Sequence, residues 1–406
     1  DIRKDSKKLF DGLEISHQKN LCEKWMNQWP VVFLSLKNVD GIHFSDAYQQ
    51  LVYEISLLYQ QHDNLLKSTA LSDRDEFEKD KFLFKQLQER QAGKTDIMRS
   101  LQFLTRLLEQ HYGKKVILLI DEYDVPIAKA NSHGYYNEMM DVIKGLMQAL
   151  KDNPSLHFAV ITGCLKIAKE SIFTGTNNFV SDTITNSRLN EYFGFVQHEV
   201  DQLLLSADFT DKASAMKEWY DGYHFGTFDV YCPWDVMNYL LELQRNPQAS
   251  PVSYWKNTSD NAIIRSFIDY AGSSITKKLE TLMAGGSILQ RVDENLTYDY
   301  LHSSEDNLWS LLYLTGYLTK AQTTIDTDEL PPGMMELKIP NAEIKEIFET
   351  TVVRWFDESA KTWNRKTLFD AIWSGDCDRI TQELTALLRR TISYHDYRED
   401  FYHAFL

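Results

Sequence analysis

Three short apolar runs in the first half of the chain are separated by longer segments with apolar residues at helical intervals. The runs are rich in β-branched residues and predict strands at Val31–Leu36, Val116–Ile120 and Leu156–Thr162. The helical spacing predicts helices over Phe44–Tyr59, Asp63–Arg90, Ile97–Tyr112 and Asn137–Leu150. This alternation predicts an α/β fold, in which a parallel sheet carries helices on both faces.

The alternation ends near Asn190, and the rest of the chain is predicted to be mostly helical. Helices are predicted at Glu199–Leu205, Lys212–Trp219, Val236–Leu243, Tyr254–Tyr270, Asp306–Leu318, Glu343–Phe356 and Lys366–Leu406. The segment Trp219–Trp234 combines aromatic residues with turn formers. It fits a stacking platform for bases or sugars, but a structural clamp between two domains is the expectation, because aromatic side chains in such connections usually serve packing.

Composition limits the class of protein. The chain has 406 residues, 43% hydrophobic and 25% charged, which predicts two or three globular domains. Its net charge of -16 argues against a general nucleic-acid-coating role. No apolar stretch approaches the roughly 20 residues that span a bilayer, so no membrane partner is expected. The four cysteines lack paired metal-ligand spacing, which argues against zinc and predicts a cytoplasmic location.

The most informative chemistry lies at the end of the second predicted strand, where Asp121 and Glu122 follow Ile120 directly. Open parallel sheets bind ligands at the carboxyl ends of their strands. In P-loop nucleotide hydrolases, an Asp at this place anchors Mg²⁺ and a Glu activates the attacking water. The alternative is that the two acidic residues only mark the point at which the chain returns to solvent.

Further candidates would act at the same edge of the sheet. Thr162 ends the third predicted strand, and right-handed crossovers put it on the edge that holds the acidic turn. Its hydroxyl would position the water or the γ-phosphate; the alternative is a bond to nearby backbone. Lys166 and Lys169 would meet phosphate, and Arg188 would act as an arginine finger. Solvated surface cations are the expectation for all three.

One segment imitates a phosphate-binding loop. Gly93-Lys94-Thr95 matches the end of GxxxxGK[ST], but Gln88 stands where the first Gly is required, and the residues before it are predicted to be helical. A charged turn between helices explains the segment better. The phosphate cradle is therefore expected upstream of Asp1, which makes the chain a fragment. His224 has no second His or Cys at ligand spacing, so no metal role is expected for it.

An ordered set of motifs covers essentially the whole chain and resembles a bacterial family of AAA-ATPase-like proteins with a C-terminal PD-(D/E)XK nuclease domain. The motifs are LFDGLEI (Leu9–Ile15), WPVVFLSLK (Trp29–Lys37), GKKVILLIDEYDVPIAKA (Gly113–Ala130), FAVITGCLKIAKESIFTGTNNF (Phe158–Phe179), EYFGF (Glu191–Phe195), WYDGYHFG (Trp219–Gly226), DVYCPWDVMNYL (Asp229–Leu240), YLTGYLT and LKIPNAEI. An ordered set of this length is far more specific than any single motif.

The resemblance implies an organisation and a site. It implies an AAA-ATPase-like domain with a P-loop NTPase-like sheet over residues 1–195, a helical lid-like subdomain over 196–250, a winged-helix-like region over 251–357 and a helical lead-in to a nuclease domain over 358–406. Asp121 and Glu122 would be the Walker B acids, anchoring Mg²⁺ and serving as general base, and Thr162 would hold the sensor position. Asp124 belongs to the same motif without an assigned role. The Walker A segment and the nuclease carboxylates would lie outside the chain.

The function implied for the parent protein is binding and hydrolysis of ATP with Mg²⁺, coupled to a nuclease-like module that acts on DNA or RNA. Homo-oligomerisation is compatible with this function, and the fragment alone is expected to be inactive. Two alternatives stay open. One is a non-hydrolysing nucleotide-dependent switch or scaffold. The other is a metal or carboxylate-pair site of Asp121, Glu122 and Asp124 unrelated to ATP, for which Asp182 would supply a further acid.

Overall fold

The computed structural model describes residues 1–3, 5–164, 179–255, 273–294, 296, 304–322, 330–331, 333–351 and 365–382. The chain divides into two compact units, Asp1–Val180 with Glu294–Leu301 and Ser181–Asp293 with His302–Leu406. The domain boundaries at residues 195, 250 and 357 stay predictions. Among the described residues, no helix is both long and apolar enough to cross a bilayer.

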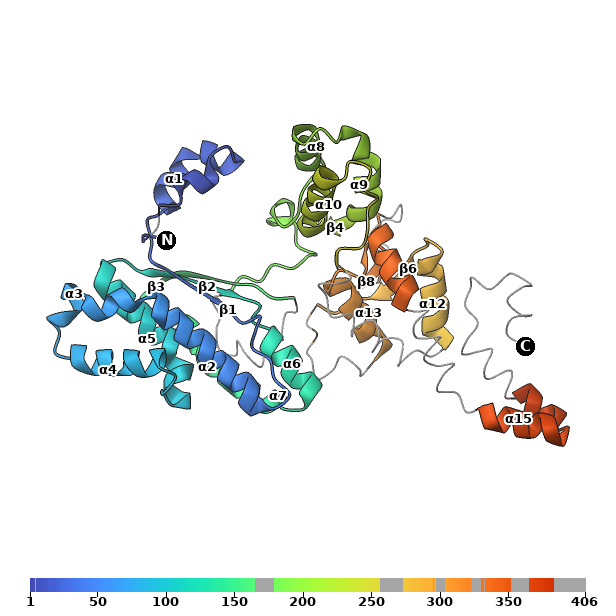
Figure 1. Ribbon diagram of the computed structural model, residues 1–406, viewed down its shortest axis with the longest axis horizontal. Coiled ribbons are helices and arrows are strands. Elements are labelled where there is room, and N and C mark those ends of the chain that lie inside the picture. Colours follow the sequence, from blue (N-terminus) through green and yellow to red (C-terminus); the bar gives the residue numbers. More distant parts are fainter. Residues whose placement is uncertain are drawn as a thin grey trace. The chain divides into compact units, whose positions relative to one another are not determined.

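The first unit is built on a parallel three-stranded sheet in the order β1-β2-β3 (Figure 1). β1 (Val31–Ser35), β2 (Val116–Asp121) and β3 (Leu156–Ile161) confirm the three strands predicted from sequence. Leu118 of β2 lies opposite Val32 of β1 and Ala159 of β3. Because the strands are parallel, all three end at one edge of the sheet, as the alternation of strands and helices predicted.

Helices and single turns make the connections of this unit. The α-helices are α1 (Lys19–Trp25), α2 (Phe44–Gln61), α3 (Thr69–Ser72), α4 (Phe77–Gln88), α5 (Lys94–Tyr112), α6 (Val125–His133) and α7 (Tyr136–Met147). The 3-10 turns are η1 (Lys7–Phe10), η2 (Glu14–His17), η3 (Asp63–Lys67) and η4 (Gln148–Leu150). The charged region 63–90, predicted to be helical, is divided into η3, α3 and α4.

One face of the sheet is covered by helices. Val32 and Leu118 are completely buried there, and they belong to one core with apolar side chains of α2, α5 and α7. Figure 1 shows α2, α5 and α7 on the same side of the sheet. Alternate residues of a strand point to opposite faces. On the other face Phe33 is 55% exposed and Val160 is 38% exposed. In the part of the chain that the structure describes, helices therefore cover one face, where the sequence pattern predicted both.

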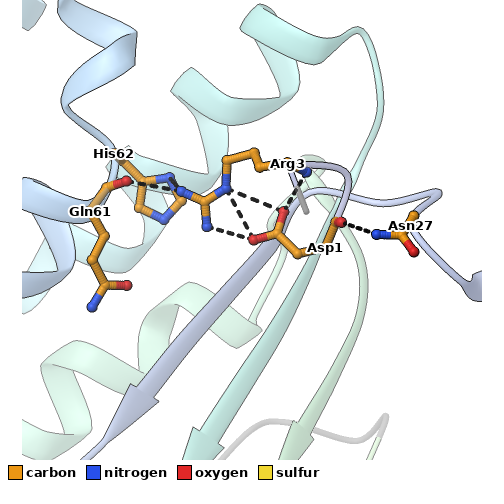
Figure 2. Close-up of polar contacts among 5 residues, drawn as sticks. All are labelled: Asp1, Arg3, Asn27, Gln61 and His62. Carbon is orange, nitrogen blue, oxygen red and sulfur yellow. Dashed lines mark hydrogen bonds and ion pairs between the residues drawn. The ribbon is translucent and has the colours of Figure 1, made fainter. Parts of the chain in front are cut away.

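The N-terminal residues are fixed to the end of α2 (Figure 2). The Arg3 guanidinium pairs with Asp1, donates to the Gln61 carbonyl oxygen at 3.0 Å and lies 3.2 Å from His62 Nδ1. His62 is 1% exposed, and its burial, with the charge of Arg3, lowers its pKa to about 3. The neutral imidazole therefore accepts the hydrogen bond from Arg3 at physiological pH.

Among the residues that the structure describes, the second unit contains two hydrophobic clusters. The first, called the α8–α10 cluster, joins α8 (Gln197–Ser206), α9 (Ala213–Tyr220) and α10 (Pro233–Arg245). The second, called the β6–β8 cluster, joins α12 (Ser273–Met283), β6 (Ile288–Arg291), α13 (Glu305–Leu314), β8 (Met334–Lys338) and the helix at 342–351. With β7 (Thr319–Lys320), its strands form an antiparallel sheet in the order β6-β8-β7. The unit also includes η5 (Asn190–Tyr192), η6 (Thr210–Lys212), α15 (Arg365–Ser374) and a helix at 377–382.

The aromatic segment Trp219–Trp234 forms a hairpin between the two clusters. β4 (Tyr223–Phe225) and β5 (Phe228–Val230) pair in antiparallel fashion. Tyr220 and Tyr231 belong to the α8–α10 cluster, whereas Tyr223 packs against the β6–β8 cluster. The segment therefore serves packing within this unit, and its role as a clamp between two domains stays a prediction.

Some sequence predictions lie outside the described residues or need correction. Residues 256–270 of the predicted helix Tyr254–Tyr270, 352–356 of Glu343–Phe356 and 383–406 of Lys366–Leu406 are outside the described part. α13 ends at Leu314, short of the predicted Leu318, because the chain turns there to enter β7. α10 begins at Pro233, three residues before the predicted start, since proline is favourable in the first turn of a helix.

Candidate active site

Asp121 and Thr162 meet at the carboxyl edge of the sheet. Asp121 is the last residue of β2, and Thr162 directly follows β3. The Thr162 hydroxyl donates to Asp121 Oδ1 at 2.5 Å, and the Thr162 N–H donates to the Ile120 carbonyl oxygen at 2.9 Å. Asp121 is half-buried and Thr162 is exposed. The two side chains predicted to share an edge are therefore in direct contact.

Glu122 begins a tight turn beside this pair. Its φ of 53° lies in the left-handed region, which residues other than glycine seldom adopt. Its N–H donates to Asp121 Oδ1 at 3.1 Å, which stabilises the turn. Burial raises the pKa of Glu122, the negative charges of Asp121 and Asp124 raise it further, and the positive charge of Lys37 opposes them. A carboxylate with a raised pKa is a better proton acceptor, which suits a general base.

Asp124 ties the acidic turn to the end of β3. It is 3% exposed, and its Oδ2 accepts the Cys164 N–H at 3.1 Å. Gly163 leaves the room for this contact, because a Cβ at that position would lie 2.5 Å from Asp124 Oδ1 and 2.7 Å from the Tyr123 ring. Burial and the charges of Asp124, Glu122 and Asp121 raise the pKa of the Cys164 thiol to about 11. Cys164 is therefore a neutral thiol at this edge.

Replacing Asp124 by Ala is expected to lower the free energy of unfolding by about 1 to 3 kcal/mol, because the Cys164 N–H loses a buried acceptor. Asp124→Asn is the matched control, since its amide oxygen can still accept that bond and its loss should be smaller. Chemical denaturation of both variants measures the difference. Equal losses in the two variants would show that the contact with Cys164 does not matter.

The structure gives different information for each of the other predicted cations. Lys166 and Lys169 lie outside the described residues. Lys94 begins α5 after the α4–α5 turn and pairs with Asp141 at 2.8 Å. Because α4 precedes this turn, the segment Gly93-Lys94-Thr95 is confirmed as a turn between helices and not a phosphate-binding loop.

Arg188 and Asp182, both considered from sequence, pair with each other. They belong to the second unit, where the Arg188 guanidinium makes a bidentate contact with the Asp182 carboxylate. His224 Nδ1 lies 2.8 Å from Asp229 Oδ1, its cross-strand partner in the β4–β5 hairpin. The described contacts of these three side chains are thus ion pairs and hydrogen bonds within their own unit.

The carboxylate oxygens at this edge decide whether Mg²⁺ fits there. Asp121 Oδ1 accepts two hydrogen bonds, whereas Asp121 Oδ2 accepts none from the described residues. Within the same residues, no group of three His, Cys, Asp or Glu side chains is arranged to hold a metal ion. Mg²⁺ is typically bound through one or two carboxylates, with phosphate oxygens and water as the remaining ligands. The carboxylate of Asp121 therefore fits Mg²⁺ that arrives with a nucleotide.

Sequence reasoning missed three residues of this neighbourhood. The Cys164 N–H donates to the Asp124 carboxylate, and Gly163 leaves room for that carboxylate. Lys37 follows β1 at the same edge, and its positive charge opposes the charge of the acidic turn. The signal for Gly163 was present, because a glycine directly after a strand-terminal Thr is typical of a close approach of another chain segment. Lys37 had no such signal, since an exposed lysine after a strand is common.

Part of this chain matches the model of a known protein family. Residues 1–173 match the family model of AAA-ATPase-like proteins, described as predicted AAA-ATPases. The match covers β1, β2, β3 and the acidic turn. The parallel sheet and the Asp121–Thr162 contact thus lie in the matched part.

One curated relative extends beyond this part. It is an uncharacterized protein from the vnfD 5' region of Azotobacter chroococcum mcd 1, and it is 25% identical over 278 residues, 68% of this chain. The aligned part is 50% of the relative, so the chain spans about half the length of the curated relative it matches. No solved structure gives a significant match.

Proposed function

We propose that the first unit is the nucleotide-hydrolysing part of a P-loop ATPase. The observation that carries the proposal is the bond between the Thr162 hydroxyl and Asp121 Oδ1, which gathers a carboxylate and a hydroxyl at the ligand-binding edge of a parallel sheet. The match of residues 1–173 to predicted AAA-ATPases supports the same activity. The ligands in this proposal are ATP and Mg²⁺.

Each side chain has a distinct role in the proposed reaction. Asp121 would hold Mg²⁺ through water, and Mg²⁺ supplies charge neutralisation at the phosphates when it is bound. Glu122 would accept a proton from the attacking water, a role that its raised pKa favours. Thr162 would orient that water or the γ-phosphate through its hydroxyl. Asp124 would keep the acidic turn against the end of β3.

We propose further that the phosphate-binding loop comes from a part of the parent protein outside residues 1–406. In the described residues, the outer edge of β3 is unpaired and one sheet face exposes Phe33 and Val160, which leaves room for another strand and helix. The curated relative is long enough to contain such a part. Nucleotide binding is therefore proposed for the full-length protein.

The test is ATP turnover and Mg²⁺ dependence of the full-length protein with Asp121→Asn. The substitution removes the charge that would hold Mg²⁺, so the Mg²⁺ concentration at half-maximal rate is expected to rise by at least about tenfold. Asp75→Asn is the control, because Asp75 is exposed in the same unit and should leave the Mg²⁺ dependence unchanged. If both variants hydrolyse ATP with the wild-type dependence on Mg²⁺, Asp121 is not a Mg²⁺ anchor. Absence of turnover in the wild-type protein would remove the ATPase proposal itself.

We propose a winged-helix-like region within residues 251–357 of the second unit. The order α12, β6, α13, β7, β8 and the antiparallel sheet β6-β8-β7 support this interpretation. All of Leu308–Tyr313 in α13 is buried. A helix buried in this way cannot insert into a DNA groove, so we propose that the region serves packing and not base recognition.

The parent protein is proposed to couple ATP hydrolysis to a PD-(D/E)XK nuclease-like module. This part of the proposal rests on the motif resemblance, and DNA or RNA would be the partner of that module. Homo-oligomerisation and a cytoplasmic location belong to the same proposal. The full reading frame tests it directly, because it would need a GxxxxGK[ST] segment before residue 1 and a D…ExK set after residue 406.

A further inference from the structure

Two acidic side chains lie in the interior of the second unit. Asp235 belongs to the first turn of α10 and is 1% exposed. Glu343 belongs to the helix at 342–351 and is 0% exposed. Buried carboxylates are normally paired with a cation, because a desolvated charge is costly. Neither side chain forms an ion pair with a Lys, Arg or His among the described residues.

The two carboxyl groups lie within hydrogen-bonding reach of each other. Glu343 Oε1 accepts the Trp255 N–H at 2.8 Å, and the Ser253 hydroxyl also reaches Glu343. Neither oxygen of Asp235 meets an N–H or O–H donor from the described residues. The Cys232 thiol is a weak donor to Asp235. Two ionised carboxylates cannot donate to each other, whereas one proton between them supplies a donor that the ionised pair lacks.

The groups that surround the pair do not compensate its charge. They are the Cys232 thiol at the start of α10 and the phenols of Tyr220, Tyr223 and Tyr254, which are all neutral at physiological pH. Burial raises the pKa of each of these groups, and the acidic pair raises it further. A second negative charge at this place would therefore lack any described counter-charge.

The pair also stands at the junction of the two hydrophobic clusters. α10 belongs to the α8–α10 cluster and the helix at 342–351 to the β6–β8 cluster. Next to the pair, Asn341 Nδ2 donates to the Asp221 carbonyl oxygen at 3.0 Å. This hydrogen bond links the residue before the helix at 342–351 to the residue after α9. A change in the charge of the pair acts directly on this junction.

We propose that Asp235 and Glu343 share one proton, and that this shared proton makes the junction between the α8–α10 and β6–β8 clusters sensitive to pH. With one proton, the pair is a hydrogen bond that holds α10 to the helix at 342–351. Without it, two negative charges repel each other in a buried place, and the junction weakens. This inference is independent of the proposed ATPase activity, because it concerns the second unit alone.

The direction of the pH dependence follows from the pKa. Burial, followed by the charge of Asp235, raises the pKa of Glu343 from 4.5 to about 8, and burial also raises that of Asp235. A carboxyl group whose pKa is raised on folding stabilises the folded state fully below its unfolded pKa. This contribution decreases as the pH rises and is lost once the pH passes about 8.

The test compares wild type with Glu343→Gln in the full chain. The amide introduced by this substitution donates to the Asp235 carboxylate, as the shared proton does, but it does not titrate. The denaturant midpoint of the wild-type second unit is expected to fall between about pH 6 and about pH 9, whereas Glu343→Gln should lose most of this fall. At about pH 9 the variant should therefore be the more stable protein.

Glu349→Gln is the matched control, because Glu349 is partly exposed on the same helix and should keep the wild-type pH dependence. Parallel pH profiles of wild type and Glu343→Gln would overturn the proposal. Infrared difference spectra give a second readout that does not depend on stability. A protonated-carboxyl C=O band should be present at neutral pH in the wild type and absent in Glu343→Gln, and its persistence in that variant would likewise reject the shared proton.

Discussion

Replacing Glu122 by Gln in the full-length protein is expected to reduce ATP turnover by about 10² to 10⁴-fold, the usual contribution of a general base. The amide keeps the size and the polarity of the side chain but cannot take a proton from water. Nucleotide affinity should change by less than about threefold, because a general base acts on the chemical step and not on ground-state binding. Single-turnover hydrolysis and equilibrium binding of ATP measure the two effects separately.

The matched control for this substitution is Glu138→Gln. Glu138 is exposed in α7 of the same unit, so its variant should hydrolyse ATP at the wild-type rate. Undiminished hydrolysis by Glu122→Gln would remove Glu122 from the mechanism. A wild-type protein that binds ATP and changes shape without hydrolysing it would instead favour the nucleotide-dependent switch or scaffold.

Gly222→Ala should strongly destabilise the second unit. A Cβ at Gly222 would lie under 3.0 Å from the Pro340 carbonyl oxygen, a separation that real Cβ atoms essentially never show. The φ of 102° at Gly222 adds backbone strain for any residue with a side chain. The expected loss in the free energy of unfolding is about 3 kcal/mol or more, measured by chemical denaturation.

Gly285→Ala separates the clash from the strain. Gly285 also has a positive φ, 85°, but no heavy atom of the described residues lies within 4 Å of the position that its Cβ would take. Its replacement should therefore cost only the backbone strain of about 1 kcal/mol. If Gly222→Ala destabilises the protein no more than Gly285→Ala does, the close approach between Gly222 and Pro340 is not needed for folding.

The sequence predicted the central sheet well because its signals are local. Val116–Ile120 is an unbroken apolar run, and strands of this kind in an α/β pattern must be parallel and must end together. The contact between Asp121 and Thr162 followed from that topology, since both residues stand at strand ends. The catalytic roles of Asp121, Glu122 and Thr162 stay predictions, because contact alone does not define a reaction.

The buried acidic pair could not be predicted in this way. Asp235 in the first turn of α10 resembles an ordinary helix-start carboxylate, which normally faces solvent and interacts with the helix dipole. Glu343 has an equally ordinary position near the start of its own helix. Only the packing of two distant segments reveals that both side chains are buried together, and no periodicity in either segment encodes that contact.

The exposed sheet face was missed for a related reason. The sequence pattern of β2 is that of a central strand covered on both faces, and four of its six residues are indeed buried. Phe33 and Phe158, on the outer strands β1 and β3, have the same apolar character but are 55% and 47% exposed. Apolar composition therefore identified the strands, although it could not tell which face is covered within the described residues.

The pairing of β1 with β2 has a consequence for how the first unit assembles. Val31 lies opposite Ile117, and the intervening chain forms α2, α3, α4 and α5. Closing a loop of this length costs conformational entropy before the pairing of β1 with β2 contributes any stabilisation. Sheets built on such distant pairings fold more slowly than domains rich in local contacts. The acidic turn at the end of β2 therefore depends on pairing between segments that are far apart in the chain.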